Sequence, residues 1–309
     1  MHSMRTHVAT PAGAELHLLA EGPVWDAAAE RLLWVDIDAG EVLAGTLDGL
    51  AIRIEARRTL DRTVGAVAPA AGGGAVVGAR TDILWLPDGV AGAAEPVRLA
   101  RVLDPDGGHR LNDGECDPAG RFLVGSLTVG GVAAARGDDV LVRLEDDGTL
   151  TTLDSDLVLS NGLAWTADGG TLFSIDTGPG VVWARDYDPA GADVGPRREH
   201  LRVEGGSPDG MCADADGGLW VAVFGAGEVR RYHPSGDVTD VITVPAPGTT
   251  SAGFAGADLA TLVVTTLRSE LSPEQAAAYP ESGRLFTARP GAVGLPRTPW
   301  NGRAAEGRR

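Results

Sequence analysis

One phrase recurs along the chain and decides the fold: EGPVWDAAAERLLWVD at 21–36, NGLAWTADGGTLFSID at 161–176 and DGMCADADGGLWVAV at 209–223. Each copy has one residue followed by Gly, a short apolar stretch, a turn and a second apolar stretch. Weaker copies begin at Val64, Asp113 and Ala252. The residue before the glycine therefore falls at 21, 64, 113, 161, 209 and 252, at intervals of 43, 49, 48, 48 and 43 residues. Six copies at this period are typical of a propeller with one four-stranded blade per copy.

Helical periodicity is nearly absent, and short apolar runs bounded by turn residues indicate strands. We predict an all-β, six-bladed β-propeller with four-stranded blades around a central channel. It is expected to form one domain over residues 1–309, with the propeller at about 7–296. Residues 7–16 should complete the last blade, because joining both chain ends in one sheet hides an open edge. Residues 271–282 should form a short helical turn with Ser272 as N-cap, and residues 297–309 a loose tail.

The composition excludes several classes of function. The 309 residues are 43% hydrophobic and 22% charged, as in globular proteins, and their net charge of -17 disfavours nucleic acid and anionic membranes as partners. The sequence contains no Lys, which excludes Schiff-base catalysis and the lysine of a nucleotide-binding loop. No apolar run approaches the length of a membrane span, and the N-terminus has no leader pattern. We expect a cytoplasmic protein, a monomer or weak dimer, with a small-molecule partner.

The repeat also predicts a metal site. Four of the six residues before glycine carry oxygen side chains: Glu21, Asp113, Asn161 and Asp209. Equivalent positions of the blades lie at one height around the channel, so these side chains are expected to converge. Carboxylate and amide oxygens without Cys or His suit Ca²⁺, or Mg²⁺ or Mn²⁺ with more water retained, and Zn²⁺ stays open. Taken singly, each residue could instead be a turn former that bonds its own backbone.

Long phrases in register then reveal a resemblance. They are AEGPVW at 20–25, RLNDGECDPAGRFLVGSL at 110–127, LSNGLAWTADGGTLFSIDT at 159–177, SPDGMCADADGGLWVAVFG at 207–225, FAGADLATLVVTT at 254–266 and SGRLFTARPGAVGLP at 282–296. They resemble the gluconolactonase, regucalcin (senescence marker protein) and luciferin-regenerating enzyme family over nearly the whole chain. The resemblance implies a six-bladed propeller with one divalent metal near the channel mouth, which hydrolyses lactones of sugar acids.

The family's site residues carry over onto five positions of this chain. The metal-binding Glu, Asn and Asp match Glu21, Asn161 and Asp209. The Asn that faces the metal, or its water, and the substrate matches Asn112 rather than Asp113, which a one-residue bulge would explain. Arg110 matches the substrate-binding Arg, although a surface ion pair is the competing interpretation in so acidic a protein. Asp113 would then lie behind the ligand set.

One segment departs from the family's pattern. Where sugar lactonases can carry an acidic residue that holds substrate hydroxyls, this chain has Val129, Gly130 and Gly131. The sugar specificity is therefore open. His109, beside the Arg110 motif, could line the pocket, and no GxSxG elbow of a serine hydrolase is present.

The residues favour a metal-dependent lactone hydrolase in which the cation polarises the carbonyl and Asp209 takes a proton from the attacking water. Two alternatives remain open at this point. One is an organophosphate or aryl ester hydrolase with Asp209 as nucleophile. The other is a non-catalytic calcium-binding propeller, because a fold does not imply a function.

Overall fold

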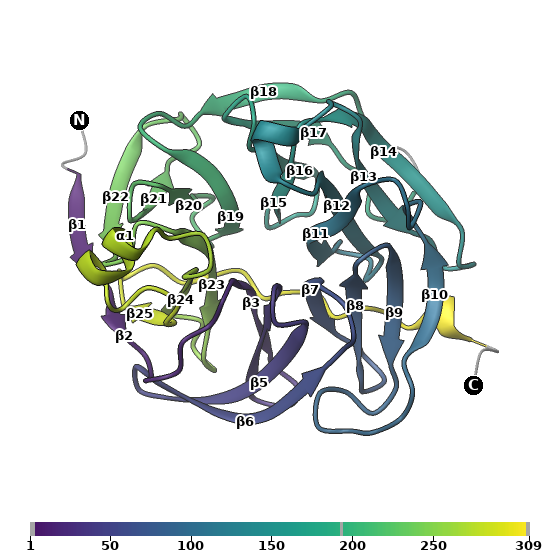
Figure 1. Ribbon diagram of the computed structural model, residues 1–309. Helices are drawn as coiled ribbons and strands as arrows, with labels where there is room; N and C mark the ends of the chain where they lie inside the picture. The colour runs from purple at the N-terminus through teal and green to yellow at the C-terminus, as the bar shows by residue number, and fades with distance from the viewer. Residues whose placement is uncertain (1–3, 192–193, 307–309) are drawn as a thin grey trace.

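Six β-sheets form a ring, each with the strand that carries the repeat glycine nearest the centre (Figure 1). The computed structural model describes residues 4–191 and 194–306. The first three blades contain, from the channel outward, β3 (Ala20–Asp26), β4 (Arg31–Asp36), β5 (Glu41–Asp48) and β6 (Ala51–Thr59); β7 (Val64–Pro69), β8 (Ala75–Ala79), β9 (Asp82–Leu86) and β10 (Val97–Arg101); and β11 (His109–Cys116), β12 (Phe122–Thr128), β13 (Asp139–Leu144) and β14 (Leu150–Leu157).

The other three blades repeat this order around the second half of the ring. They contain β15 (Ser160–Trp165), β16 (Thr171–Asp176), β17 (Val181–Asp186) and β18 (Arg198–Arg202); β19 (Ser207–Ala213), β20 (Leu219–Phe224), β21 (Glu228–Tyr232) and β22 (Val238–Thr243); and β23 (Thr249–Ala255), β24 (Thr261–Thr266), β25 (Phe286–Ala288) and β2 (Thr10–Pro11). The predicted six-bladed propeller is confirmed, and every residue before a repeat glycine lies on an innermost strand.

Burial explains why the inner strands are almost wholly apolar. Every residue of β7 and β8 is buried, because both faces of these strands pack against neighbouring blades. The outermost strand β6 instead alternates between exposed and partly buried residues, with Ile52 and Ile54 on the inner face and charged residues on the outer face. The hydrophobic core therefore lies in layers between adjacent blades.

Each innermost strand carries a register shift at the same point, next to the residue before the repeat glycine. In β3 the shift lies between Glu21 and Val24, and in β19 between Pro208 and Met211. A β-bulge leaves residues unpaired and redirects their side chains. The bulges thus leave Asp113 and Asp209 without a paired partner and change the direction of the side chains at one end of the channel.

The N-terminal segment divides between two blades. Thr10 and Pro11 pair with β25 and complete the last blade, as predicted. The prediction is wrong for His7 and Val8, because β1 (Arg5–Val8) adds a fifth, parallel strand to β22 of the preceding blade. The buried Asp240 carboxylate explains the attachment, since it pairs with Arg5 at 2.7 Å and His7 at 3.1 Å.

The C-terminal segment is not a loose tail. Helix α1 (Pro273–Ala278) begins at the predicted N-cap Ser272, but residues 297–306 then run across the end of the channel opposite the bulges (Figure 1). The Trp300 amide bonds to the Pro69 carbonyl, and its ring is 1% exposed against Trp85. The short 3₁₀ helices η1 (Gly131–Ala134) and η2 (Arg303–Ala305) complete the secondary structure. The last three residues of the predicted tail, 307–309, lie outside the described residues.

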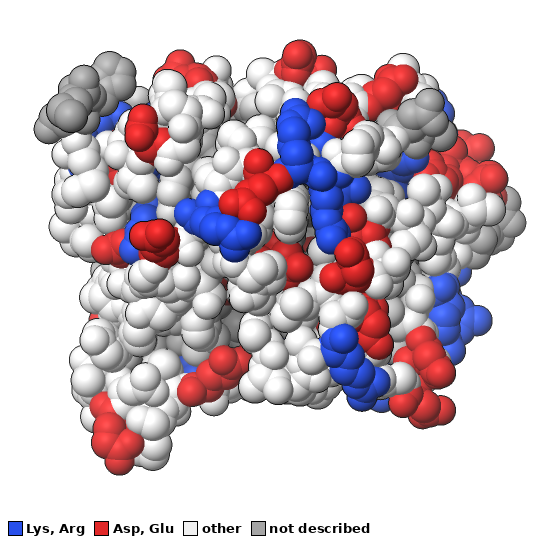
Figure 2. Space-filling view, turned by 90° about the horizontal axis from the view of Figure 1, so that it is seen from above, with Lys and Arg blue, Asp and Glu red and all other residues white. Residues whose placement is uncertain are grey.

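The outer wall carries charges of both signs. Figure 2 shows acidic and basic side chains next to one another on one side of the ring, without a continuous basic patch on that side. Arg197, just before the outermost strand β18, contacts Asp154 at 3.0 Å and Asp156 at 2.7 Å on the outermost strand β14. Within the part of the chain that the structure describes, no helix is long and apolar enough to cross a membrane.

Candidate active site

A cavity of about 490 Å³ opens at the end of the channel where the innermost strands begin. All five side chains that the sequence assigned to the site line it: Glu21, Arg110, Asn112, Asn161 and Asp209. They come from β3, β11, β15 and β19, and each lies at or beside the bulge of its strand. Residues up to 188 positions apart in the sequence are thus brought to one wall.

The bulge in β11 separates Asn112 from Asp113. The pairing with β12 shifts between Leu111 and Gly114, so both residues are unpaired. Asn112 lines the 490 Å³ cavity, whereas Asp113 lines a smaller one of about 30 Å³ deeper in the channel, together with Arg297. The register of the repeat alone favoured Asp113, and the structure places Asn112 with the other candidate ligands.

A chain of hydrogen bonds fixes the amide side chains. Arg110 Nη1 donates to Asn112 Oδ1 at 2.8 Å, and Asn112 Nδ2 donates to Asn161 Oδ1 at 2.9 Å. Asn161 Nδ2 in turn donates to the hydroxyl of Thr177 at 2.9 Å, and this hydroxyl donates to the Pro208 carbonyl at 2.8 Å. Asn112 therefore connects the guanidinium to Asn161, and Thr177 is a positioning residue that the repeat did not reveal.

The two carboxylates of the site lack a counter-charge of their own. Glu21 is 6% exposed, and burial together with the charges of Asp209 and Asp113 raises its pKa well above the usual value. Burial also raises the pKa of Asp209, with Asp113 and Glu270 acting in the same direction. The single guanidinium of the cavity, Arg110, opposes both shifts.

This donor set fits a hard divalent cation. Two carboxylates that repel each other in a partly dehydrated site are relieved by a nearby positive charge. Glu21 and Asp209 supply anionic oxygens and Asn161 a neutral one, the ligand types that Ca²⁺, Mg²⁺ and Mn²⁺ accept. The residues that would hold the metal are therefore the three that the sequence predicted.

A second group of potential ligands lies beside the cavity without lining it. His109 Nδ1 is 3.0 Å from Asp139 Oδ1, and its Nε2 is 3.8 Å from Asp138. Asp139 already accepts hydrogen bonds from the Ser126 hydroxyl at 2.7 Å and the Thr128 amide at 2.9 Å. These bonds tie β12 to the start of β13, so the group stabilises the blade. The expectation that His109 could line the pocket is wrong.

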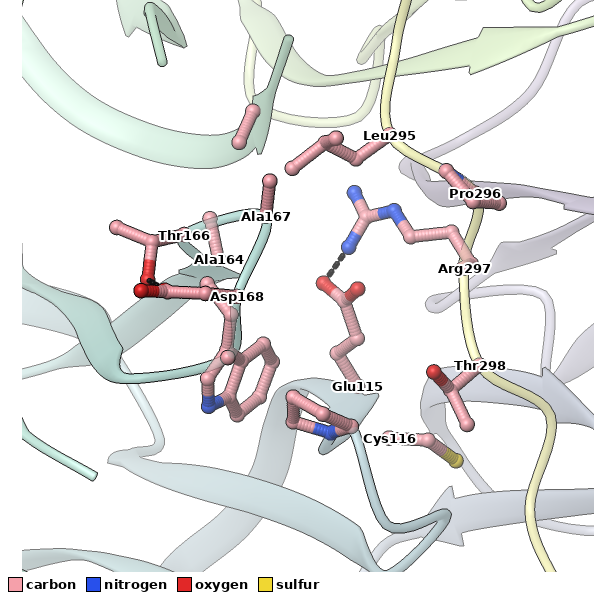
Figure 3. Close-up of a pocket in the computed structure, with 14 residues that line it drawn as sticks. Glu115, Cys116, Ala164, Thr166, Ala167, Asp168, Leu295, Pro296, Arg297 and Thr298 are labelled. Atoms are coloured by element: carbon pink, nitrogen blue, oxygen red, sulfur yellow. Dashed lines mark hydrogen bonds and ion pairs between the residues drawn. The ribbon is translucent and has the colours of Figure 1, made fainter. Parts of the chain in front are cut away.

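The opposite end of the channel contains charged groups that the sequence did not reveal. A cavity of about 270 Å³ lies there. In this cavity Arg297 of the C-terminal segment reaches Glu115 at the end of β11 and forms an ion pair (Figure 3). Arg297 also donates to the Met211 carbonyl at 3.3 Å. Burial lowers the pKa of Arg297 to about 10, so this side chain stays charged at neutral pH. Burial also raises the pKa of the nearby Asp113 to about 6.

Comparisons of sequence agree with the geometry. The family described as "SMP-30/Gluconolactonase/LRE-like region" matches residues 19–268. Regucalcin of Danio rerio is 33% identical over 278 residues, which cover 88% of this chain and 90% of that protein. The 6-deoxy-6-sulfogluconolactonase of Pseudomonas putida is 35% identical over 279 residues, covering 88% of this chain and 91% of that protein.

Comparisons of structure give the same fold. A luciferin-regenerating enzyme has a TM-score of 0.85 at 26% identity, covering 93% of this chain and 96% of that chain. A regucalcin from Agrobacterium tumefaciens, described as calcium-binding, is similar in fold with a TM-score of 0.85 at 24% identity, covering 97% and 99%. The sequence match over most of its length and the shared propeller show that the chain belongs to the SMP-30/gluconolactonase/LRE-like family.

Proposed function

We propose that the protein is a divalent-metal-dependent lactone hydrolase of the gluconolactonase type. The observation that carries the proposal is the convergence of Glu21, Asn161 and Asp209 with Asn112 and Arg110 in one cavity of about 490 Å³. The similarity to a protein named 6-deoxy-6-sulfogluconolactonase supports a lactone as substrate. A lactone ring is small enough for a cavity of this size.

The residues of the cavity would have three different roles in hydrolysis. A divalent cation held by Glu21, Asn161 and Asp209 would polarise the lactone carbonyl as a Lewis acid. Asp209 would accept a proton from the attacking water as the general base. Arg110, through the donors it does not use on Asn112, would orient the oxygens of the substrate.

The decisive experiment measures turnover of a panel of aldonolactones, acyl lactones, aryl esters and organophosphates with several divalent ions. A lactonase hydrolyses lactones fastest, loses activity with a chelator and regains it with metal. Faster turnover of aryl esters or organophosphates would favour the alternative hydrolase. Metal binding without turnover of any substrate would favour a non-catalytic propeller.

The first prediction concerns metal binding itself. A divalent ion at 100 times its Kd should stabilise the fold by about 2.7 kcal/mol, which corresponds to a rise in Tm of roughly 5 °C for a domain of this size. Differential scanning fluorimetry measures the shift. Glu21→Gln should reduce it strongly, because an anionic ligand is lost.

The matched control for this measurement is His109→Ala. It removes the side chain shared by Asp138 and Asp139 but leaves Glu21 and Asp209 in place. It should keep the full metal-dependent shift. A shift that survives in Glu21→Gln and disappears in His109→Ala would contradict the proposed ligand set.

The second prediction concerns Arg110. Arg110→Ala should raise KM about tenfold or more, because a charge-assisted hydrogen bond to substrate is lost, and should lower kcat by a smaller factor. The wild-type enzyme should discriminate weakly among uncharged sugar lactones, because Gly130 leaves space where an acidic partner could stand. Steady-state kinetics check both. Arg53→Ala, at the exposed outer edge of the first blade, is the control and should leave KM unchanged.

A further inference from the structure

Two carboxylates at the mouth of the cavity form no ion pair with any described residue. Asp38 follows β4 and Glu270 follows β24, and both are exposed to solvent and line the cavity. The hydroxyl of Ser269 donates to Asp38 at 2.8 Å, which joins the loops of the first and last blades into one wall. Among the ion pairs of the described residues, neither carboxylate takes part.

The electric field of this wall reaches the candidate site. The negative charges of Asp38 and Glu270 both act on the Arg110 guanidinium, and Glu270 acts on Asp209 as well. Four carboxylates and one guanidinium line the cavity. A bound divalent cation would therefore still leave the lining with a net negative charge.

The segment on the blade-3 side of the cavity supplies no cation to offset these charges. It consists of Val129 to Val132, and the side chains of Val129 and Val132 are 61% and 48% exposed. Nη1 of Arg110 already donates hydrogen bonds to the Leu111 carbonyl and to Asn112 Oδ1. An acidic group on a ligand would thus meet four carboxylates and the single guanidinium of Arg110 in the cavity lining.

From this arrangement, and resting on the lactonase function proposed above, we propose that Asp38 and Glu270 form a charge filter. The filter favours lactones with uncharged substituents over lactones with an acidic substituent and disfavours rebinding of the product. Hydrolysis breaks the bond between the acyl carbon and the ring oxygen and forms a bond from that carbon to the water oxygen. One water proton passes to the ring oxygen, and the acid formed releases the other, so an uncharged lactone becomes an anion.

The test compares D-glucono-1,4-lactone with D-glucaro-1,4-lactone, which share one ring and differ in a hydroxymethyl or a carboxylate at C6. The wild type should favour the uncharged lactone in kcat/KM by about tenfold. Asp38→Asn and Glu270→Gln should each reduce this preference about threefold, and the double variant about tenfold, as expected for charges near solvent. The inhibition constant of gluconate should fall in the same proportions. Salt of about 1 M should weaken the wild-type preference, because it screens exposed charges.

The matched control is the double variant Glu30→Gln/Asp216→Asn. It also removes one Glu and one Asp charge, but from exposed turns at the other ends of the innermost strands. The preference for the uncharged lactone should stay at the wild-type value. An unchanged preference in the Asp38/Glu270 double variant, or an equal change in the control, would overturn the filter.

Calorimetric binding of both lactones separates this inference from the proposed function. If neither lactone is hydrolysed but the uncharged one binds more tightly, and the preference depends on Asp38 and Glu270, the lactonase proposal fails and the filter stands. If both are hydrolysed at equal kcat/KM by the wild type, the filter fails and the lactonase stands. A chain that bound neither lactone would overturn both.

Discussion

Asp209→Asn should lower kcat by about 10²–10⁴-fold at saturating metal, the range typical of lost acid-base catalysis. The change keeps an oxygen ligand of nearly equal size and removes the base. Metal affinity should fall only moderately. Glu21→Gln also removes one anionic ligand but keeps Asp209, so saturating metal should restore much of its activity. Steady-state kinetics of both variants, with metal occupancy checked by elemental analysis, measure the difference.

The control for this comparison is Asp113→Asn. Asp113 lines the smaller cavity and accepts a hydrogen bond from the Gly114 amide at 2.7 Å, so it does not face the substrate site. Its kcat should stay near the wild-type value. Equal recovery of Asp209→Asn and Glu21→Gln would show that Asp209 is only a ligand. A large loss in Asp113→Asn would then identify the group that activates the water.

The ring of six blades could be predicted because its signal is local. Each blade begins with a glycine beside a bulge and continues through a short turn, and both features are encoded within about 16 residues, as in Asn161–Asp176. Side chains at equivalent positions then converge by geometry alone, which is why Glu21, Asn161 and Asp209 were found. The repeat alone predicted Asp113 where the structure has Asn112, because a bulge shifts the register by an amount that a sequence period does not encode.

The remaining features depend on contacts between segments far apart in the chain. Residues Arg5 to Val8 read equally well as a strand of the last blade, and the buried carboxylate of Asp240 decides otherwise. Asp38 and Glu270 stand outside the repeated phrase, so only the shared cavity connects them. One signal for Asp38 was available, because it follows the second strand of its blade and that strand ends at the level of Glu21.

The polar C-terminal residues gave the least reliable signal. Their composition is typical of a loose tail, but Trp300 is an apolar anchor, and the partner of Arg297 is Glu115, 182 positions earlier. Arginine side chains are mostly exposed, and they are buried only where a partner such as a carboxylate pairs with the guanidinium. That carboxylate is visible only in the folded ring.

Arg297→Met should therefore destabilise the protein by about 2–3 kcal/mol, because removal of one partner leaves the other charge of a largely buried pair uncompensated. The side chains of Arg297 and Glu115 are 18% and 16% exposed, and Asp113 adds a second buried carboxylate nearby. The double variant Arg297→Met/Glu115→Gln removes both charges and should recover much of the loss. Chemical denaturation measures the free energies of unfolding.

Arg303→Met is the matched control for this prediction, because Arg303 lies on the same segment and also forms an ion pair, at 2.6 Å from Asp146. That pair is 63% and 41% exposed, so its loss should change the free energy of unfolding very little. Equal effects of Arg297→Met and Arg303→Met would mean that the segment only covers the channel. A large effect confined to Arg297, relieved by Glu115→Gln, would show that its charge holds together the carboxylates beneath the candidate metal site.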